Sequence, residues 1–139
     1  MKNECFLDTN ILMYAAAGSE SELRKKLIAR EIIANQKFCL SGQVLAEFYV
    51  NLLKKAAKPL SLAKIDQWID KLSEFDVEPV GMEVIRSSIF YSRRFKISYW
   101  DAAIIAAADR LGAPILYTED LNHGQKYGTV TAINPFKAG

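Results

Sequence analysis

Hydrophobic residues occur along this chain in two kinds of segment, short apolar runs and longer stretches with the spacing of a helix. The short runs predict strands over residues 5–7, 38–40, 77–80, 114–117 and 130–133. The longer stretches predict helices over residues 11–17, 19–35, 42–57, 61–74, 82–95 and 99–111. Ser19 and Glu22 have the spacing of a capping box, Ser61 is a predicted N-cap, and Gly112 follows the last helix.

Strands alternate with helices along the chain, which predicts a parallel sheet with helices on both of its faces. The predicted strands are short and almost entirely apolar, as expected for a sheet that is covered on both faces. We therefore expect an α/β fold, a three-layer α/β/α sandwich with a short-stranded, mostly parallel central sheet. No repeat, linker or low-complexity segment interrupts the pattern, so residues 1–139 are expected to form a single domain.

Composition narrows the class of protein without identifying its function. Half of the 139 residues are hydrophobic and 24% are charged, which is typical of a globular domain and excludes disordered, collagen-like and coiled-coil chains. Eighteen basic and sixteen acidic residues give a net charge of +2. That charge is too small to indicate nucleic-acid binding by itself.

The apolar segments also bear on the cellular compartment. The apolar run at 102–108 is far shorter than the roughly 20 residues that a membrane span needs, so no membrane association is expected. The polar residues 8–10 interrupt the apolar run near the N-terminus, which argues against a secretory signal. We therefore expect a cytoplasmic protein in which Cys5 and Cys39, both within apolar runs, are buried and reduced.

Acidic residues fall where the predicted sheet would place a functional site. In open α/β sheets such sites lie at the carboxyl ends of the strands. Asp8 directly follows the first predicted strand, and Glu119 and Asp120 follow the fourth. Glu47 lies in the second turn of the helix after the second strand, and Asp101 lies in the first turn of the last helix.

Each of these acids also has a purely structural explanation. Asp8 is a favoured N-cap residue, Asp101 suits the first turn of a helix, and Glu47 is compatible with a solvated helix face. The acids at 119 and 120 are common residues in turns. Taken singly, none of the acids identifies a site.

Taken together, the acids predict a metal site. Carboxylates gathered at one sheet edge repel one another, and desolvated like charges either take up protons or recruit a cation. No histidine or cysteine cluster accompanies the acids in the sequence, so the ligands would be oxygens, which suit Mg²⁺ or Mn²⁺. Acid clusters with one or two such ions are typical of enzymes that cleave phosphodiester bonds.

Four short motifs around these acids resemble those of the PIN domain family. The motifs are FLDTNIL at 6–12, SGQVLAEF at 41–48, SYWDAAI at 98–104 and YTEDL at 117–121. Each motif is weakly specific alone, whereas the set occurs in the order that the family has and covers most of the chain. The chain also has the size of a stand-alone PIN protein of the VapC type, the toxin half of a toxin–antitoxin pair.

This resemblance implies a metal-dependent endoribonuclease with a cluster of four acids. The residues that match the family's acidic quartet, as catalytic residues and ligands of Mg²⁺ or Mn²⁺, are Asp8, Glu47, Asp101 and Asp120. The residues that match the polar neighbours of these acids are Thr9, Asn10, Ser41 and Thr118. Whether Glu119 or Asp120 is the fourth acid in space stays open. The resemblance also implies an RNA substrate, a cognate antitoxin protein and a homodimer.

Basic and aromatic side chains give weaker indications of a nucleic-acid surface. Arg93, Arg94 and Lys96 directly precede the third motif and are candidate phosphate contacts, although a solvated helix face explains them as well. The aromatic residues near the motifs, including Trp100, are expected to pack within the fold, with base stacking as the alternative. The apolar residues of the predicted helix 61–74 belong either to the core or to a partner surface.

Other functions are also compatible with parts of this pattern. A PIN nuclease in RNA processing or turnover would need no antitoxin, and a non-catalytic RNA-binding or interaction module would have lost its metal. A receiver-type phosphoacceptor domain also carries acids at strand ends. Such a domain would need a second acid beside Asp8 and a lysine after a late strand. Asp8 is not followed by an acid, and Thr118 is followed by acids instead of a lysine.

Overall fold

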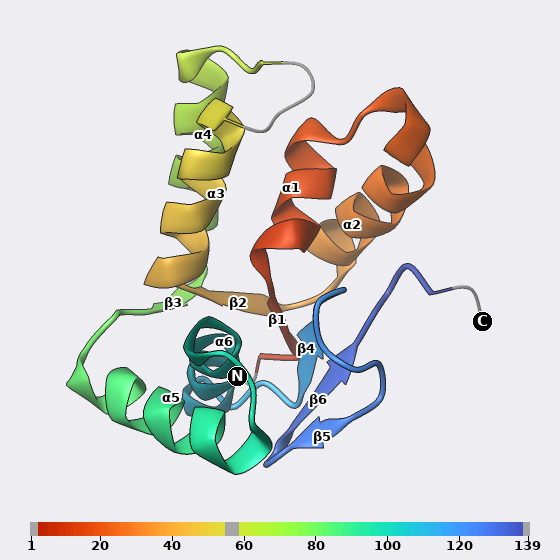
Figure 1. The fold of residues 1–139 in the computed structure, drawn as a ribbon. Helices are drawn as coiled ribbons and strands as arrows, with labels where there is room; N and C mark the ends of the chain where they lie inside the picture. Colours follow the sequence, from red (N-terminus) through yellow and green to blue (C-terminus); the bar gives the residue numbers. More distant parts are fainter. Residues whose placement is uncertain (1–2, 55–58, 138–139) are drawn as a thin grey trace.

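A computed structural model describes residues 3–54 and 59–137 and confirms the expected α/β architecture (Figure 1). The strands of the described chain are β1 (Cys5–Leu7), β2 (Phe38–Ser41), β3 (Asp76–Glu78), β4 (Ile115–Tyr117), β5 (Lys126–Tyr127) and β6 (Val130–Ile133). The helices are α1 (Thr9–Ala17), α2 (Leu23–Asn35), α3 (Gly42–Lys54), α4 (Leu62–Leu72), α5 (Met82–Phe95) and α6 (Tyr99–Arg110). A short 3-10 helix at Glu20–Glu22 precedes α2.

The sheet has the strand order β3-β2-β1-β4-β6-β5, and all of its strand pairs are parallel except that of β5 with β6. Strand β1 therefore lies in the interior of the sheet between β2 and β4. Its last residue, Leu7, pairs with Tyr117 of β4. Because parallel strands end at the same edge, Asp8 and Thr118 leave the sheet side by side.

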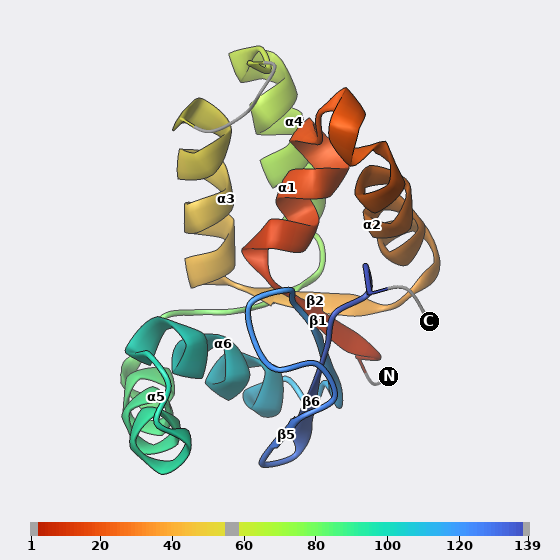
Figure 2. The same cartoon turned by 45° about the vertical axis from the view of Figure 1, so that its right-hand side comes forward.

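Helices cover both faces of the sheet and complete three layers (Figures 1 and 2). Helices α1 to α4 lie on one side, and α5 and α6 lie on the other. The apolar run of α6 from Ala102 to Ala108 is entirely buried, because α6 packs against both α5 and the sheet. The small alanine side chains allow this close approach, which brings the first turn of α6 to the carboxyl edge of the sheet.

Most predicted boundaries agree with the structure to within two residues. Helix α1 begins two residues earlier than predicted, because the Thr9 N–H donates to Asp8 Oδ1 at 2.7 Å and Asp8 caps the helix. The capping box of Ser19 and Glu22 is present, but it opens the short 3-10 helix, and α2 follows. Strand β3 ends before Pro79, which cannot donate to a ladder. The predicted end of α3 at residue 57 lies outside the described residues.

Strand β5 is an element that the hydrophobic pattern did not predict. It has only two residues, too few for an alternating pattern, and it pairs antiparallel with β6. The turn between them uses Gly128, whose φ of 65° is left-handed. A Cβ atom there would also lie 3.3 Å from the Tyr91 hydroxyl, so Gly128 fits this turn for two reasons.

The structure also bears on the cysteines and on membrane association. Cys5 and Cys39 are buried and free, as predicted, and burial raises the pKa of both thiols to about 12. The Cys39 thiol donates to the Cys5 carbonyl oxygen at 3.4 Å. None of the helices within 3–54 and 59–137 has the length and apolar character that crossing a bilayer requires.

Candidate active site

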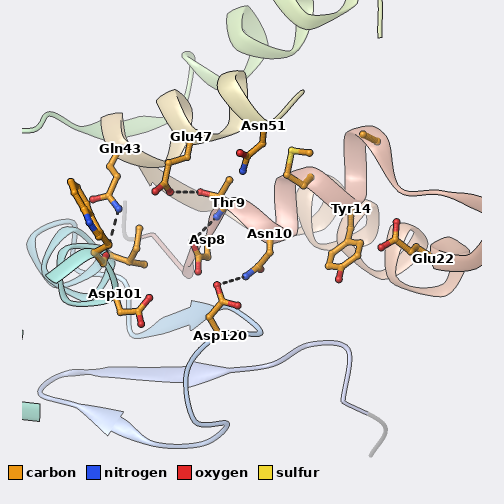
Figure 3. A pocket seen from close by; sticks show the side chains of 14 residues that line it. Asp8, Thr9, Asn10, Tyr14, Glu22, Gln43, Glu47, Asn51, Asp101 and Asp120 are labelled. Carbon is orange, nitrogen blue, oxygen red and sulfur yellow. Dashed lines mark hydrogen bonds between the residues drawn. The ribbon is translucent and has the colours of Figure 1, made fainter. Parts of the chain in front are cut away.

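A pocket of about 490 Å³ opens at the carboxyl edge of the sheet, and all four predicted acids line it (Figure 3). Asp8 comes from the end of β1 and Glu47 from the second turn of α3. Asp101 comes from the first turn of α6, and Asp120 comes from the loop after β4. The fold thus brings together the four predicted acids from separate segments, and Glu22 of the 3-10 helix, which was not predicted, lines the pocket as well.

Asp8 is the most enclosed of these acids, with 8% of its surface exposed. Its carboxylate accepts hydrogen bonds from the Thr9 N–H at 2.7 Å and from the Thr118 hydroxyl at 2.8 Å. Burial nevertheless raises the pKa of Asp8 to about 6, and the charges of Asp120 and Glu47 act in the same direction. The two hydrogen bonds oppose this rise without cancelling it, so the charged form of Asp8 is costly as the site stands.

Glu47 is tied to the same segment through Thr9. The Thr9 hydroxyl donates to Glu47 Oε1 at 2.9 Å, so this residue holds Asp8 with its backbone and Glu47 with its side chain. Gln43 and Asn51 also line the pocket, one turn before and one turn after Glu47. Sequence analysis did not identify these two amides, although their four-residue spacing from Glu47 places them on the same face of α3.

Asp120 is held by an amide side chain. Asn10 Nδ2 donates to Asp120 Oδ2 at 3.1 Å, and the Asp120 N–H donates to Thr118 Oγ1 at 3.1 Å. Desolvation raises the pKa of Asp120, and the charges of Asp101 and Glu119 act in the same direction. The other amide atom of Asn10, Oδ1, is buried and has no hydrogen-bond partner among the described residues.

Glu119 takes a different direction from its neighbour Asp120. The Tyr14 hydroxyl donates to Glu119 Oε1 at 2.6 Å, and Lys25 Nζ lies 3.0 Å from Glu119 Oε2. The cation of Lys25 therefore neutralises Glu119 on the side of α1 and α2. Asp120 is the acid of this pair that lines the pocket, which answers the question left open by the sequence.

Other predicted site residues lie outside the acid pocket. Ser41 is buried, and its hydroxyl accepts from the Val44 N–H at 3.2 Å, so it supports the start of α3 instead of contacting an acid. Arg93, Arg94 and Lys96 are exposed at the end of α5 and do not line the pocket. Their part in binding nucleic acid stays a prediction.

The aromatic and apolar residues divide between core and surface. Trp100 lines the pocket with 64% of its surface exposed, so the expectation that it packs within the fold is wrong. In the predicted helix 61–74, by contrast, Ile65 and Leu72 are buried and pack into the core. Leu62, which is 66% exposed, is the exception.

The pocket has the donor chemistry of a hard-cation site. Its donors are carboxylate and amide oxygens, including the unpartnered Asn10 Oδ1, and the described residues that line it include no lysine or arginine. Within the described residues, no three acidic, histidine or cysteine side chains approach closely enough to hold one ion in common. The oxygen donors fit Mg²⁺ or Mn²⁺ by type.

Comparison with known proteins identifies the family. Residues 5–128 match the family model described as the PIN domain, and the chain belongs to this family. No curated protein matches the chain in sequence. The predicted resemblance is thereby confirmed at the level of the family.

Solved structures show the same fold at low sequence identity. A toxin–antitoxin complex from Klebsiella pneumoniae is 18% identical, with a TM-score of 0.71, and the match covers 96% of this chain and 99% of that one. VapC20 from Mycobacterium tuberculosis, described as a toxin that cleaves the sarcin–ricin loop, is 17% identical with a TM-score of 0.65, covering 84% and 89%. VapBC2 from Rickettsia felis, bound to a promoter DNA fragment, is 18% identical with a TM-score of 0.61, covering 92% and 96%.

Proposed function

We propose that this protein is an endoribonuclease that uses Mg²⁺ or Mn²⁺ to hydrolyse RNA phosphodiester bonds in the acid-lined pocket. The observation that carries the proposal is the meeting of the four predicted acids from separate segments in one pocket, which Glu22 also lines, without a cationic side chain among its described lining residues. Membership of the PIN family supports it. So does the similarity of the fold to a toxin described as cleaving the sarcin–ricin loop.

We assign the metal-binding role to the four acids. Asp8 and Asp101 would hold the principal ion, and Glu47 and Asp120 would complete its surroundings, directly or through water. When bound, such an ion lowers the pKa of a coordinated water and neutralises charge on the scissile phosphate. Hydrolysis by water does not require the 2′-hydroxyl, so a preference for RNA would come from contacts elsewhere on the substrate.

Residues that donate hydrogen bonds to the acids would orient them. Thr118 and the Thr9 backbone fix the Asp8 carboxylate, the Thr9 hydroxyl fixes Glu47, and Asn10 fixes Asp120. All of these donors are neutral. They therefore set the direction of each carboxylate while leaving its charge available to a cation.

We further propose that the protein is the toxin of a toxin–antitoxin pair and acts in the cytoplasm as a homodimer. The similar structures from Klebsiella pneumoniae and Rickettsia felis contain toxin–antitoxin assemblies, which supports an antitoxin as partner. Exposed apolar side chains on α3, Val50 and Leu53 among them, offer area for a protein contact. A neighbouring gene for a small DNA-binding protein would favour the toxin over a PIN nuclease of RNA turnover.

Cleavage of RNA by the purified protein tests the enzymatic proposal. The assay would compare wild type with Asp101→Asn in Mg²⁺, in Mn²⁺ and in excess chelator, and Asp66→Asn on the exposed face of α4 is the matched control. We expect chelation to abolish cleavage and Asp101→Asn to lose more than roughly 100-fold, the upper range for residues that only support a ligand. Asp66→Asn should cleave like wild type.

Two results would contradict this proposal. Cleavage that persists in chelator, or in an Asp101→Asn protein free of contaminating nuclease, would exclude the metal site as the catalyst.

If no RNA is cut, calorimetric titration with Mn²⁺ decides between an unmatched substrate and a non-catalytic module. Binding by wild type that weakens in Asp101→Asn supports the metal site, whereas equal heats from both proteins contradict it.

A further inference from the structure

A second cavity of about 400 Å³ adjoins the acid pocket and has a different lining. Its walls are mainly apolar and include Val80, Val84 and Tyr99. Gln43, Glu47 and Trp100 line both cavities, so the two spaces adjoin at these side chains. A ligand that occupied both cavities would therefore contact Trp100.

Trp100 stands at the junction of the two cavities. It precedes Asp101 in the first turn of α6, and 64% of its surface is exposed. Its ring meets that of Tyr99 edge to face, with the centroids 5.1 Å apart and an interplanar angle of 86°. Gln43 Nε2 donates to the Trp100 carbonyl oxygen at 3.5 Å. An aromatic side chain that packs little in the fold and lies beside a charged pocket is suited to stacking on a ligand.

The far wall of the apolar cavity is held by ion pairs. Pro79 and Val80 belong to the segment between β3 and α5. Arg110 of α6 binds Glu78 at 2.7 Å and Glu83 at 2.6 Å, one before and one after this segment. The same guanidinium thus links both ends of this segment to α6.

The chemistry of the two cavities matches that of one nucleotide step. The acid pocket, with its ion, would take a phosphate, whereas the apolar cavity suits the flat faces of a nucleobase. The amide of Gln43 offers a hydrogen-bonding group to the polar edge of the base. A base paired within a duplex cannot stack in this way, because its faces and edge are already occupied.

We propose that Trp100 and the apolar cavity form a binding site for a nucleobase next to the scissile phosphate, with the face of the base stacked on the indole. This inference rests on the proposed ribonuclease function. Trp100 is assigned as the stacking platform, and Gln43 contributes to the choice of base.

Fluorescence of Trp100 tests the contact without relying on cleavage. The chain has two tryptophans, and Trp68→Phe leaves Trp100 as the only one. This protein would be mixed rapidly in Mg²⁺ with single-stranded octaribonucleotides of one base each, with an abasic octamer, and with a blunt duplex of the same length. We expect saturable quenching by base-bearing single strands and none by the abasic octamer or the duplex. Equal quenching by the abasic octamer, or none by any strand, would overturn the proposal.

Steady-state cleavage of an unpaired RNA gives the second test. Trp100→Ala should raise KM by roughly 5- to 150-fold, the range that stacking of one base provides, with little change in kcat. Trp100→Phe should recover most of this loss, and Phe90→Ala, which removes a 58% exposed aromatic from α5, should match wild type. Circular dichroism would check that every variant folds.

The outcomes separate this inference from the function on which it rests. If wild type cleaves RNA and Trp100→Ala has an unchanged KM, the base site is wrong and the ribonuclease stands. If wild type cleaves no RNA and binds no Mn²⁺, the proposed function fails, and quenching by base-bearing strands still reports whether the cavity binds a base.

Discussion

Acidic side chains are held in two different ways in two regions of this protein. In the pocket, Asp8, Glu47 and Asp120 accept hydrogen bonds from hydroxyl, amide and backbone N–H groups, all of them neutral. Away from the pocket, some acids are paired with cations, whereas Asp76 and Asp109 accept from the neutral side chains of Asn3 and Thr129. Arg110 binds Glu78 and Glu83, and Lys25 binds Glu119.

The difference lies in how far the charge of each carboxylate is offset within the protein. A cationic partner neutralises a carboxylate, whereas a neutral donor fixes its direction and leaves its charge. Glu119 and Asp120 show this contrast between neighbours in one loop, because the first is paired with a lysine and the second accepts from an amide. Within the described residues, no ion pair offsets the charge of Asp8, Glu47 or Asp120, which supports the proposed cation site.

The largest expected effect concerns the cost of keeping Asp8 charged. The pKa of Asp8 in the folded protein is about 6, above the ordinary value of 3.8. Between these pH values the folded chain therefore binds more protons than the unfolded chain does. The stabilising contribution of protonated Asp8 is present below pH 4 and is lost as the pH rises through 6. Without metal at pH 7.5, Asp8→Asn should therefore be more stable than wild type by up to about 3 kcal/mol.

Urea unfolding in chelator at pH 7.5 and at pH 4 measures this difference. The gap between variant and wild type should shrink at pH 4, where both proteins carry a neutral side chain. The exposed Asp66→Asn serves as control and should follow wild type at both pH values. A variant that is less stable than wild type at pH 7.5 would show that the Asp8 charge is already compensated within the protein.

An intermediate effect is expected from the neutral donors. Thr9→Val removes the hydroxyl that holds Glu47 and keeps the backbone N–H that holds Asp8. We expect kcat to fall roughly 10- to 100-fold, the range for residues that orient metal ligands. Kinetics and urea unfolding would be measured together. Thr129→Val, which removes a hydroxyl bonded to Asp109 outside the pocket, is the matched control. Equal losses of activity in both variants would refute a special role for Thr9.

The smallest effect is expected where a cation already neutralises the acid. Lys25→Met breaks a partly exposed pair with Glu119 and should cost less than about 1 kcal/mol of stability. Cleavage should change by less than roughly fivefold, the factor that such a free energy represents. Lys64→Met, which changes an exposed lysine on α4, is the matched control, and its stability and cleavage should follow wild type. A loss of activity as large as that of Thr9→Val would place Glu119 among the functional acids.

The long elements and the strand ends were predictable from the sequence for physical reasons. Helix α5 runs from Met82 to Phe95 as predicted, because fourteen residues carry a clear helical period. The position of Asp8 followed from the rule that parallel strands end at one edge, and the structure shows that it both caps α1 and lines the pocket. The structural and functional explanations of Asp8 were therefore not alternatives.

The features that the sequence did not predict are side-chain directions in loops, a very short strand and the exposure of a residue in the folded protein. Glu119 and Asp120 are neighbours in a loop without a period, so only the partners Lys25 and Asn10 reveal which acid lines the pocket. Strand β5 is too short to give a pattern. The exposure of Trp100 is a tertiary property, because its neighbours in α6 are buried almost throughout.

The hydrogen bond between Asp8 and Thr118 joins residues that are 110 positions apart. At about 5 to 20 residues per second, a ribosome needs roughly 5 to 20 s to add the segment between them. During that time the growing chain carries Asp8 without its hydroxyl partner and without Asp120. Translation itself thus imposes a delay between making the first acid and completing the pocket, so no partly made chain that ends before Thr118 holds the full set of acids.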